Sequence, residues 1–179
     1  MASHVALLRG INVGGRNKVP MADLREVVTS LGHTGVSTYI QSGNVLFSAD
    51  TAAVAKLPAV VGKKIVTRFG FEVPIVVRSQ RELAAVARAH PFGGDGVDVS
   101  ILAVMFLGDK PSAKQIATLD PARSPRDQFV VRGREIFVHC PTGFAKTKLT
   151  NAWFDSRLAT VSTARNWRTV LKLDELLRG

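Results

Sequence analysis

The sequence predicts an α+β protein made of two tandem ferredoxin-like units, each with the element order βαββαβ, followed by a C-terminal helix. Three observations support this fold class. Strand and helix patterns alternate in this order twice, the two halves end in similar segments, and a glycine-rich stretch separates them. We therefore expect a first unit at residues 1–91, a linker at 92–99 and a second unit with the final helix at 100–179.

The first half has a short apolar run at residues 4–9, which predicts a strand. Apolar residues then recur at helical spacing over 21–31, and Gly32 is a typical helix stop. Residues 36–41 and 44–48 are predicted strands around a tight turn at Ser42 and Gly43. A helix is expected at 51–69, kinked or divided by Pro58, and a Val- and Ile-rich strand at 72–78.

The second half repeats this order. We expect a strand at 100–107, a short helix at 112–119, a hairpin formed by 128–132 and 135–140, a helix at 148–158 and a strand at 159–164. The final helix carries apolar residues on one side. Residues 78–83 align with residues 165–170, and both segments lead from a strand through an arginine into a helix. This match indicates a duplicated unit, although such an exit can also recur by chance.

Composition excludes several classes of protein. A hydrophobic content of 46% with 21% charged residues is typical of a folded core. Cys140 is the single cysteine, which rules out an internal disulfide framework and a zinc site made of cysteine pairs. The four histidines share no ligand spacing, so no metal or cofactor is expected. No apolar run has membrane-spanning length and the start lacks signal-peptide features, so we expect a cytoplasmic protein with no membrane partner.

Three segments carry a resemblance to a known family. They are LRGINVGG at 8–15 with NKV at 17–19, TYIQSGNV at 38–45, and TARNWRTV at 163–170. With the shorter motifs HPF at 90–92 and KLTN at 148–151, the chain resembles the bacterial family DUF1697, a domain of unknown function, over essentially its whole length. The family more often has Asn where His90 stands, and often Ser where Thr147 stands. The resemblance implies two α+β units and implies no activity.

The loop after the first strand is the strongest candidate for binding. Its glycines allow backbone N–H groups to converge on an anion, and its side chains add charges and neutral donors. In a ferredoxin-like unit this loop and the turn between the second and third strands lie at the same end of the sheet, so we expect one site there. Glycine and asparagine would equally serve only to turn the chain. The candidate residues are Asn12, Gly14, Gly15, Arg16, Asn17, Lys18, Tyr39, Gln41, Ser42 and Asn44.

A second group of candidates lies in the second half. The segment 140–147 is similar to a nucleotide-binding P-loop but has Cys140 and Ala145 at the framework glycine positions, so nucleotide hydrolysis is rejected. Its lysines, expected at a helix start, would suit a bound anion or project into solvent. The residues before the final helix would clamp an anion or cap the helix. This group comprises Lys146, Lys148, Arg165, Asn166 and Arg168.

The formal net charge of +10 suits a polyanionic partner. Basic residues cluster, with four and no acidic residue between positions 51 and 71. We therefore expect a non-enzymatic binder of a phosphate-bearing partner, either nucleic acid, which we place first, or a phosphorylated small molecule. One alternative is an enzyme or small-anion binder with a pocket between the first loop and the hairpin. A second alternative is a protein interaction module. No catalytic residue and no oligomeric state can be assigned from the sequence.

Overall fold

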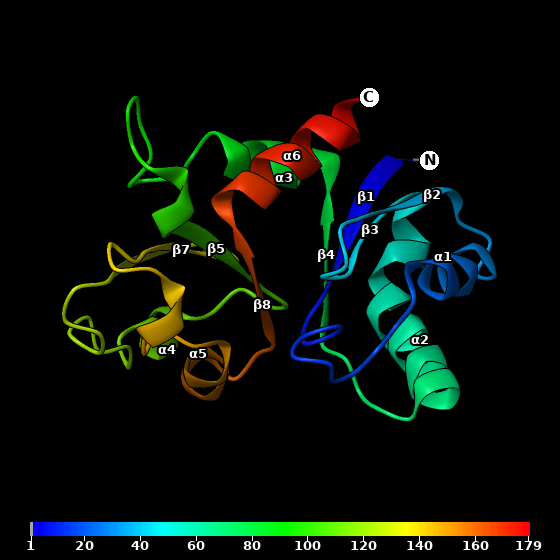
Figure 1. The fold of residues 1–179 in the computed structure, drawn as a ribbon, viewed down its shortest axis with the longest axis horizontal. Coiled ribbons are helices and arrows are strands. Elements are labelled where there is room, and N and C mark those ends of the chain that lie inside the picture. Colours follow the sequence, from blue (N-terminus) through cyan, green and yellow to red (C-terminus); the bar gives the residue numbers. More distant parts are fainter. Residues whose placement is uncertain (1) are drawn as a thin grey trace. The chain divides into compact units, whose positions relative to one another are not determined.

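The computed structural model describes residues 2–179 and shows two antiparallel sheets, each with its own helices (Figure 1). The described residues form two compact units: unit 1 comprises residues 2–83 with Leu173–Gly179, and unit 2 comprises Ala84–Lys172. Residue 1 lies outside the described residues. Helix α3 (Gln80–Ala87) and helix α6 (Trp167–Arg178) each begin directly after the last strand of a sheet.

Unit 1 has the strand order β2-β3-β1-β4, in which all neighbours are antiparallel. This is the order of a ferredoxin-like sheet and confirms the predicted fold class. Helices α1 and α2 supply buried side chains, such as Leu24, Val61 and Ile65, to one core with Ala6 and Phe47 of the sheet. The elements are β1 (Ala2–Leu8), α1 (Met21–Thr29), β2 (Thr34–Tyr39), β3 (Asn44–Ala49), α2 (Thr51–Phe69) and β4 (Ile75–Ser79).

Unit 2 repeats this topology with the strand order β6-β7-β5-β8. Its core joins Met105 and Ile136 of the sheet to Leu119, Phe154 and Leu158 from the helical side. The elements are a 3-10 turn (Val99–Ile101), β5 (Leu102–Leu107), α4 (Ala113–Ile116), β6 (Gln128–Arg132), β7 (Glu135–His139), a 3-10 turn (Phe144–Lys146), α5 (Asn151–Leu158) and β8 (Ser162–Asn166). The same strand order in both units supports the duplication expected from the sequence.

Of the two outcomes expected at Pro58, a kink or a division, the division does not occur, because α2 runs unbroken from Thr51 to Phe69. Proline removes one backbone hydrogen bond and disfavours a helix interior. Leu57, Val61 and Ile65 are all buried along one face on both sides of the proline. Packing of this continuous apolar face supplies most of the stability of such a helix, which explains why the helix persists through Pro58.

Among the other boundaries that differ from the prediction, two bear on the candidate binding residues. Strand β2 ends at Tyr39, which pairs with Asn44, so the hairpin turn spans 40–43 and is longer than the predicted tight turn. The reason is Ile40, whose φ of 49° takes the chain out of the strand conformation. Helix α5 begins at Asn151, three residues after Lys148, because the Thr150 hydroxyl accepts the N–H of Trp153 at 3.2 Å and caps the helix there.

Candidate functional site

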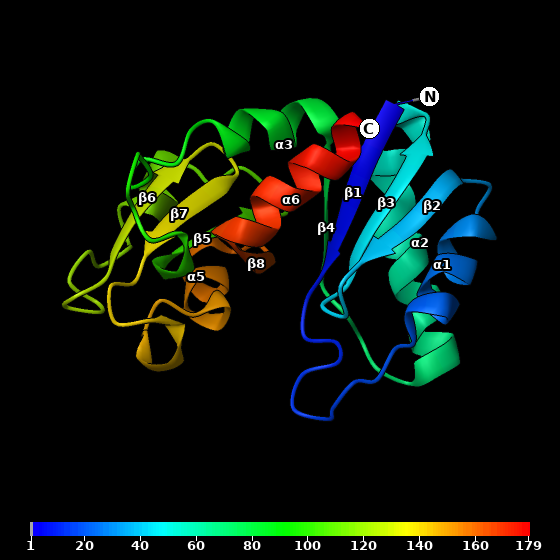
Figure 2. The same ribbon diagram turned by 45° about the horizontal axis from the view of Figure 1, so that its top comes forward.

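The loop between β1 and α1 is a small hairpin that extends past the end of the sheet of unit 1 (Figure 2). Val13 and Arg16 form a bridge, in which the Arg16 N–H donates to the Val13 carbonyl at 3.0 Å. Gly14 and Gly15, at the tip, have φ values of 57° and 75°. Positive φ at both central residues is the requirement of a type I′ turn, so these glycines serve the turn. The Arg16 and Lys18 side chains are exposed to solvent.

Asn12 fixes the base of this loop. Its Nδ2 donates to the carbonyls of Val19 and Gln41, and its Oδ1 accepts the N–H of Val19, all at 2.9 Å. Asn17 acts similarly, since its Nδ2 donates to the Gly10 carbonyl at 3.0 Å. Both asparagines have the positive φ that this residue type tolerates. The two amides are therefore used within the protein and hold the charged tip in one conformation.

The hairpin turn at 40–43 lies beside the loop, as the ferredoxin-like topology predicts, because Asn12 bonds to the Gln41 carbonyl. Asn44 is fully buried, and its Nδ2 donates to the Tyr39 carbonyl at 2.9 Å and to Ser42 Oγ at 3.0 Å. Gln41 is exposed and Tyr39 is half-buried. Gln41 lies in the turn, so the same-face alternation expected for a longer strand does not extend to it.

A close approach of two backbones explains the glycine at position 43. A Cβ at Gly43, where φ is 85°, would lie 2.7 Å from Ile11 Cδ1 and 2.8 Å from Leu8 Cβ. The Leu8 N–H also donates to the Gly43 carbonyl at 2.9 Å. Only glycine fits this space and this conformation. The turn is thus packed tightly against the end of β1, where the loop begins.

The candidate lysines of unit 2 lie on a segment that is held by hydrogen bonds to Ser124 and Asp127. Lys146 and Lys148 are exposed, and the Lys148 N–H donates to Ser124 Oγ at 3.2 Å. Beneath them, Oδ2 of the buried Asp127 accepts the hydroxyls of Ser124 at 2.5 Å and Thr147 at 2.7 Å. Because α5 starts at Asn151, neither lysine occupies the helix start at which both were predicted.

Cys140 lies under the same segment and is fully buried. Burial is the main cause that raises the pKa of its thiol to about 11, and the nearby Asp127 carboxylate raises it further. The thiolate is the reactive form of cysteine, so Cys140 is a structural side chain and a poor nucleophile.

The predicted cluster before the last helix is split by the fold. Arg165 is 7% exposed, and its Nη1 donates to Thr163 Oγ1 and to the Ala164 carbonyl, both at 2.8 Å. Its enclosure lowers the pKa of the guanidinium to about 10. Asn166 caps α6, since its Oδ1 accepts the N–H of Thr169 at 2.8 Å. Of the two arginines in this cluster, Arg168 is exposed.

Arg78 of unit 1 corresponds to Arg165 in the aligned segments and is also buried, at 1% exposure. The Arg78 Nη1 donates to the Val77 carbonyl, as Arg165 does to Ala164. The alignment of residues 78–83 with 165–170 thus corresponds to a shared local structure. No pattern in a single sequence signals that this shared arginine is enclosed.

A groove between α1 and α2, lined in part by Lys63 and Lys64, was not predicted from the sequence. The sequence shows that residues 51–71 contain basic but no acidic side chains. It does not show which of these side chains face α1. Within residues 2–179, no group of three or more side chains is arranged to hold a metal ion. No helix in that range is both long enough and apolar enough to cross a membrane.

Comparisons with known proteins identify relatives without an assigned activity. A family model described as a protein of unknown function (DUF1697) matches residues 1–137. A solved structure described as a conserved bacterial protein, SP0830 from Streptococcus pneumoniae, is similar with a TM-score of 0.74 and 25% sequence identity. The match covers 100% of this chain and 99% of that protein. No curated protein sequence matches this chain significantly.

Proposed function

Because the chain belongs to the DUF1697 family, whose description names no activity, we propose its function from the site itself: non-enzymatic binding of a phosphate-bearing partner, with nucleic acid placed first. The observation that carries this proposal is the hairpin loop after β1. It presents Arg16 and Lys18 to solvent on a backbone held by Asn12 and Asn17.

The charges on this loop are available to a ligand. Within the described part of the chain, Arg16 and Lys18 form no ion pair. Each phosphate neutralised by such a cation releases counterions, which is the main source of affinity in non-specific binding to nucleic acid. A backbone already held in one conformation loses less entropy on binding than a mobile loop does. Fixed geometry and free charge together favour an anion at this end of unit 1.

The neighbouring polar groups favour a binder over an enzyme. Ser42 Oγ accepts a hydrogen bond from Asn44 Nδ2, which fixes the turn. The sequence has no histidine near Ser42 that would activate its hydroxyl as a nucleophile. The amides of Asn12 and Asn44, which a small-molecule pocket would need as donors, are engaged inside the protein. What remains for a ligand is the charged outer edge, which suits an extended polyanion.

The test is a titration of nuclease-treated protein with labelled single-stranded RNA and duplex DNA, followed by fluorescence anisotropy at several salt concentrations. We expect binding that weakens as salt rises. The double variant Arg16→Ala, Lys18→Ala should flatten the plot of log affinity against log salt by about 1.8 for duplex DNA and about 1.4 for single-stranded RNA, that is about 0.9 or 0.7 for each phosphate that is no longer neutralised.

A matched control removes the same charge from unit 2. Lys114 and Arg126 are exposed and lie outside the proposed site, so Lys114→Ala with Arg126→Ala should leave the slope nearly unchanged. Equal effects of the two double variants would show that only total charge matters and would reject the loop as the site. Failure to bind either nucleic acid at low salt would reject the proposal itself.

A second candidate, a protein interaction module, is favoured by two exposed apolar side chains at the same end of unit 1. Val13 is 64% exposed at the loop tip, and Ile40 is 48% exposed in the adjacent turn. Ile40 also has a φ of 49°, a conformation that is costly for a β-branched residue. If this candidate holds, a Val13→Ser, Ile40→Asn variant will lose a cellular protein partner that resists nuclease, while RNA affinity stays unchanged.

A further inference from the structure

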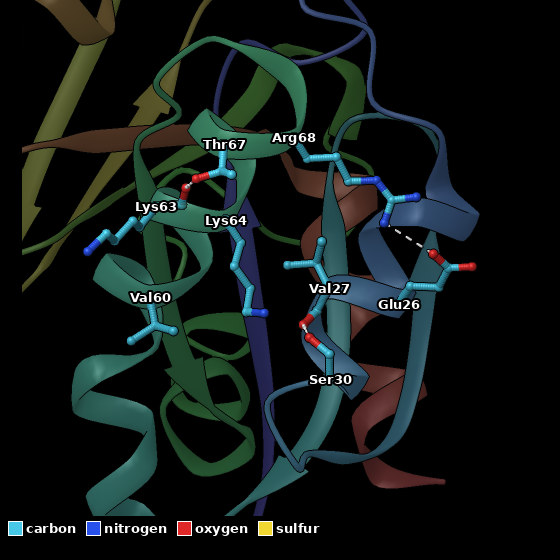
Figure 3. Close-up of a pocket in the computed structure, with 8 residues that line it drawn as sticks. All are labelled: Glu26, Val27, Ser30, Val60, Lys63, Lys64, Thr67 and Arg68. Atoms are coloured by element: carbon cyan, nitrogen blue, oxygen red, sulfur yellow. Dashed lines mark hydrogen bonds and ion pairs between the residues drawn. The ribbon is translucent and has the colours of Figure 1, made fainter.

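Helices α1 and α2 enclose a groove of about 600 Å³ on unit 1. A volume of this size lies within the range of pockets for small ligands, which is roughly 300–1,000 Å³. One wall comes from Glu26 and Val27 of α1 and from Ser30, which follows this helix, and the other comes from α2. Figure 3 shows the Lys64 side chain extending from α2 into the space beside Val27 and Ser30.

The charges of the groove do not cancel. Arg68 is neutralised at one end, since its guanidinium pairs with Asp23 at 2.9 Å and with Glu26 at 3.1 Å. Lys63 and Lys64 are exposed, and among residues 2–179 they have no ion-pair partner. Arg68 together with its two carboxylate partners carries a net charge of −1, so with the two lysines the groove region keeps a net charge of +1, which favours an anionic ligand.

The hydroxyl groups of the groove do not compete with the lysines for an anion. Ser30 Oγ donates to the Val27 carbonyl at 2.8 Å, and Thr67 Oγ1 donates to the Lys63 carbonyl at 3.0 Å. Each hydroxyl has one hydrogen, so both are left as acceptors only. In Figure 3 the Lys64 ammonium points toward the α1 wall, whereas the Lys63 side chain extends away from it. The Lys64 ammonium is thus the available donor inside the groove, and an anionic group would bind to it.

The remaining lining is apolar. Val27 is 5% exposed and packs into the core of unit 1, while Val60 is 39% exposed on the opposite wall. An exposed valine in a groove gains free energy when a ligand covers it. A phosphate backbone would leave Val60 exposed to water, whereas a hydrocarbon body would cover it.

We propose that the α1–α2 groove is a binding site for a small amphipathic anion, a molecule with one carboxylate or phosphate head and a short apolar body. The head pairs with the Lys64 ammonium group, and the body covers Val60 and lies against Val27. This site uses none of the residues of the β1–α1 loop, so it stands independently of the nucleic-acid proposal.

The test uses octanoate as the probe, with octylammonium and inorganic phosphate as comparisons, and follows the methyl signals of Val27 and Val60 by NMR. We expect octanoate to shift both signals in a saturable way. Octylammonium, which carries the opposite charge, and phosphate, which lacks the apolar body, should each shift them much less. Equal shifts with octylammonium or with phosphate would overturn the proposal.

Matched variants on α2 separate the groove from the helix surface in general. Lys64→Gln should weaken octanoate binding by about two- to fivefold, the range expected for one solvent-accessible ion pair. Lys56→Gln removes the same charge from the same helix outside the groove and should have no effect. Val60→Thr should weaken binding, whereas Val66→Thr, at another exposed valine of α2, should not. Equal effects within either pair would contradict the proposed site.

Discussion

Replacing Asn12 with alanine tests whether the loop after β1 is held in place by one side chain. The Asn12 amide makes three hydrogen bonds at 2.9 Å, two with Val19 and one with the Gln41 carbonyl. Asn12→Ala removes all three and places alanine at a φ of 55°. The charges of Arg16 and Lys18 are untouched, so the variant separates the effect of loop order from the effect of charge.

The expected cost follows from these hydrogen bonds. Each of them contributes about 1 kcal/mol net, and water will replace part of that at a half-buried site, which leaves about 2 kcal/mol for the three bonds. Alanine in the left-handed region adds about 1 kcal/mol relative to asparagine. The total is about 3 kcal/mol, and for a chain of this size it lowers Tm by about 6–12 °C.

The assay combines thermal unfolding, followed by circular dichroism, with titration of labelled RNA at several salt concentrations. We expect a lower Tm and weaker RNA binding, with the salt slope unchanged because no cation is removed. The control is Lys18→Ala, which should leave Tm within about 2 °C and reduce the slope for single-stranded RNA by about 0.7. A Tm shift under about 2 °C for Asn12→Ala would refute the structural reasoning. Normal RNA affinity despite a lower Tm would refute the role of loop order in binding.

Three other predictions concern stability and reactivity. Gly43→Ala should lower the free energy of unfolding by about 2–5 kcal/mol through its close contacts and positive φ, whereas Gly14→Ala, which meets no atom within 4 Å, should cost only about 1 kcal/mol in chemical denaturation. Cys140 should react slowly with iodoacetamide until urea unfolds the protein. Folding raises the pKa of its thiol from 9.0 to about 11. The stability that the neutral thiol contributes is therefore present below pH 9.0 and lost as the pH rises toward 11. Burial lowers the pKa of His90 from 6.5, so the stability from its neutral ring is present above pH 6.5 and lost as the pH falls through the folded pKa; His90→Asn should flatten this part of a plot of Tm against pH.

Local sequence patterns correctly predicted most of the helices and strands. Apolar residues at helical spacing defined α1, and β-branched runs defined β4, because these patterns reflect which side of an element is buried. The repeated order of elements then fixed the fold class, since few topologies connect βαββαβ without crossing loops. The neighbouring positions of the first loop and the β2–β3 turn followed from that topology alone, and the Asn12–Gln41 bond confirms them.

Local rules failed where distant contacts outweighed them. Pro58 should interrupt a helix by its own chemistry, yet the buried face made by Leu57, Val61 and Ile65 keeps α2 continuous. The turn after β2 was placed too late because the positive φ of Ile40 has no signature in the sequence. The first miss arises because the packing energy that holds α2 together comes from core residues of other elements, which are remote along the chain.

The candidate binding residues show the same difference between what the sequence determines and what the folded structure determines. The sequence by itself determined which residue types are present: a net charge of +10, glycines and asparagines in the first loop, and arginines before the final helix. Only the tertiary structure decided which of them face outward. It left Arg16 and Lys18 exposed, enclosed Arg165, and set Lys64 in a groove beside α1. Charge is a property of a residue, whereas exposure depends on everything packed around it, and that is fixed only when the chain folds.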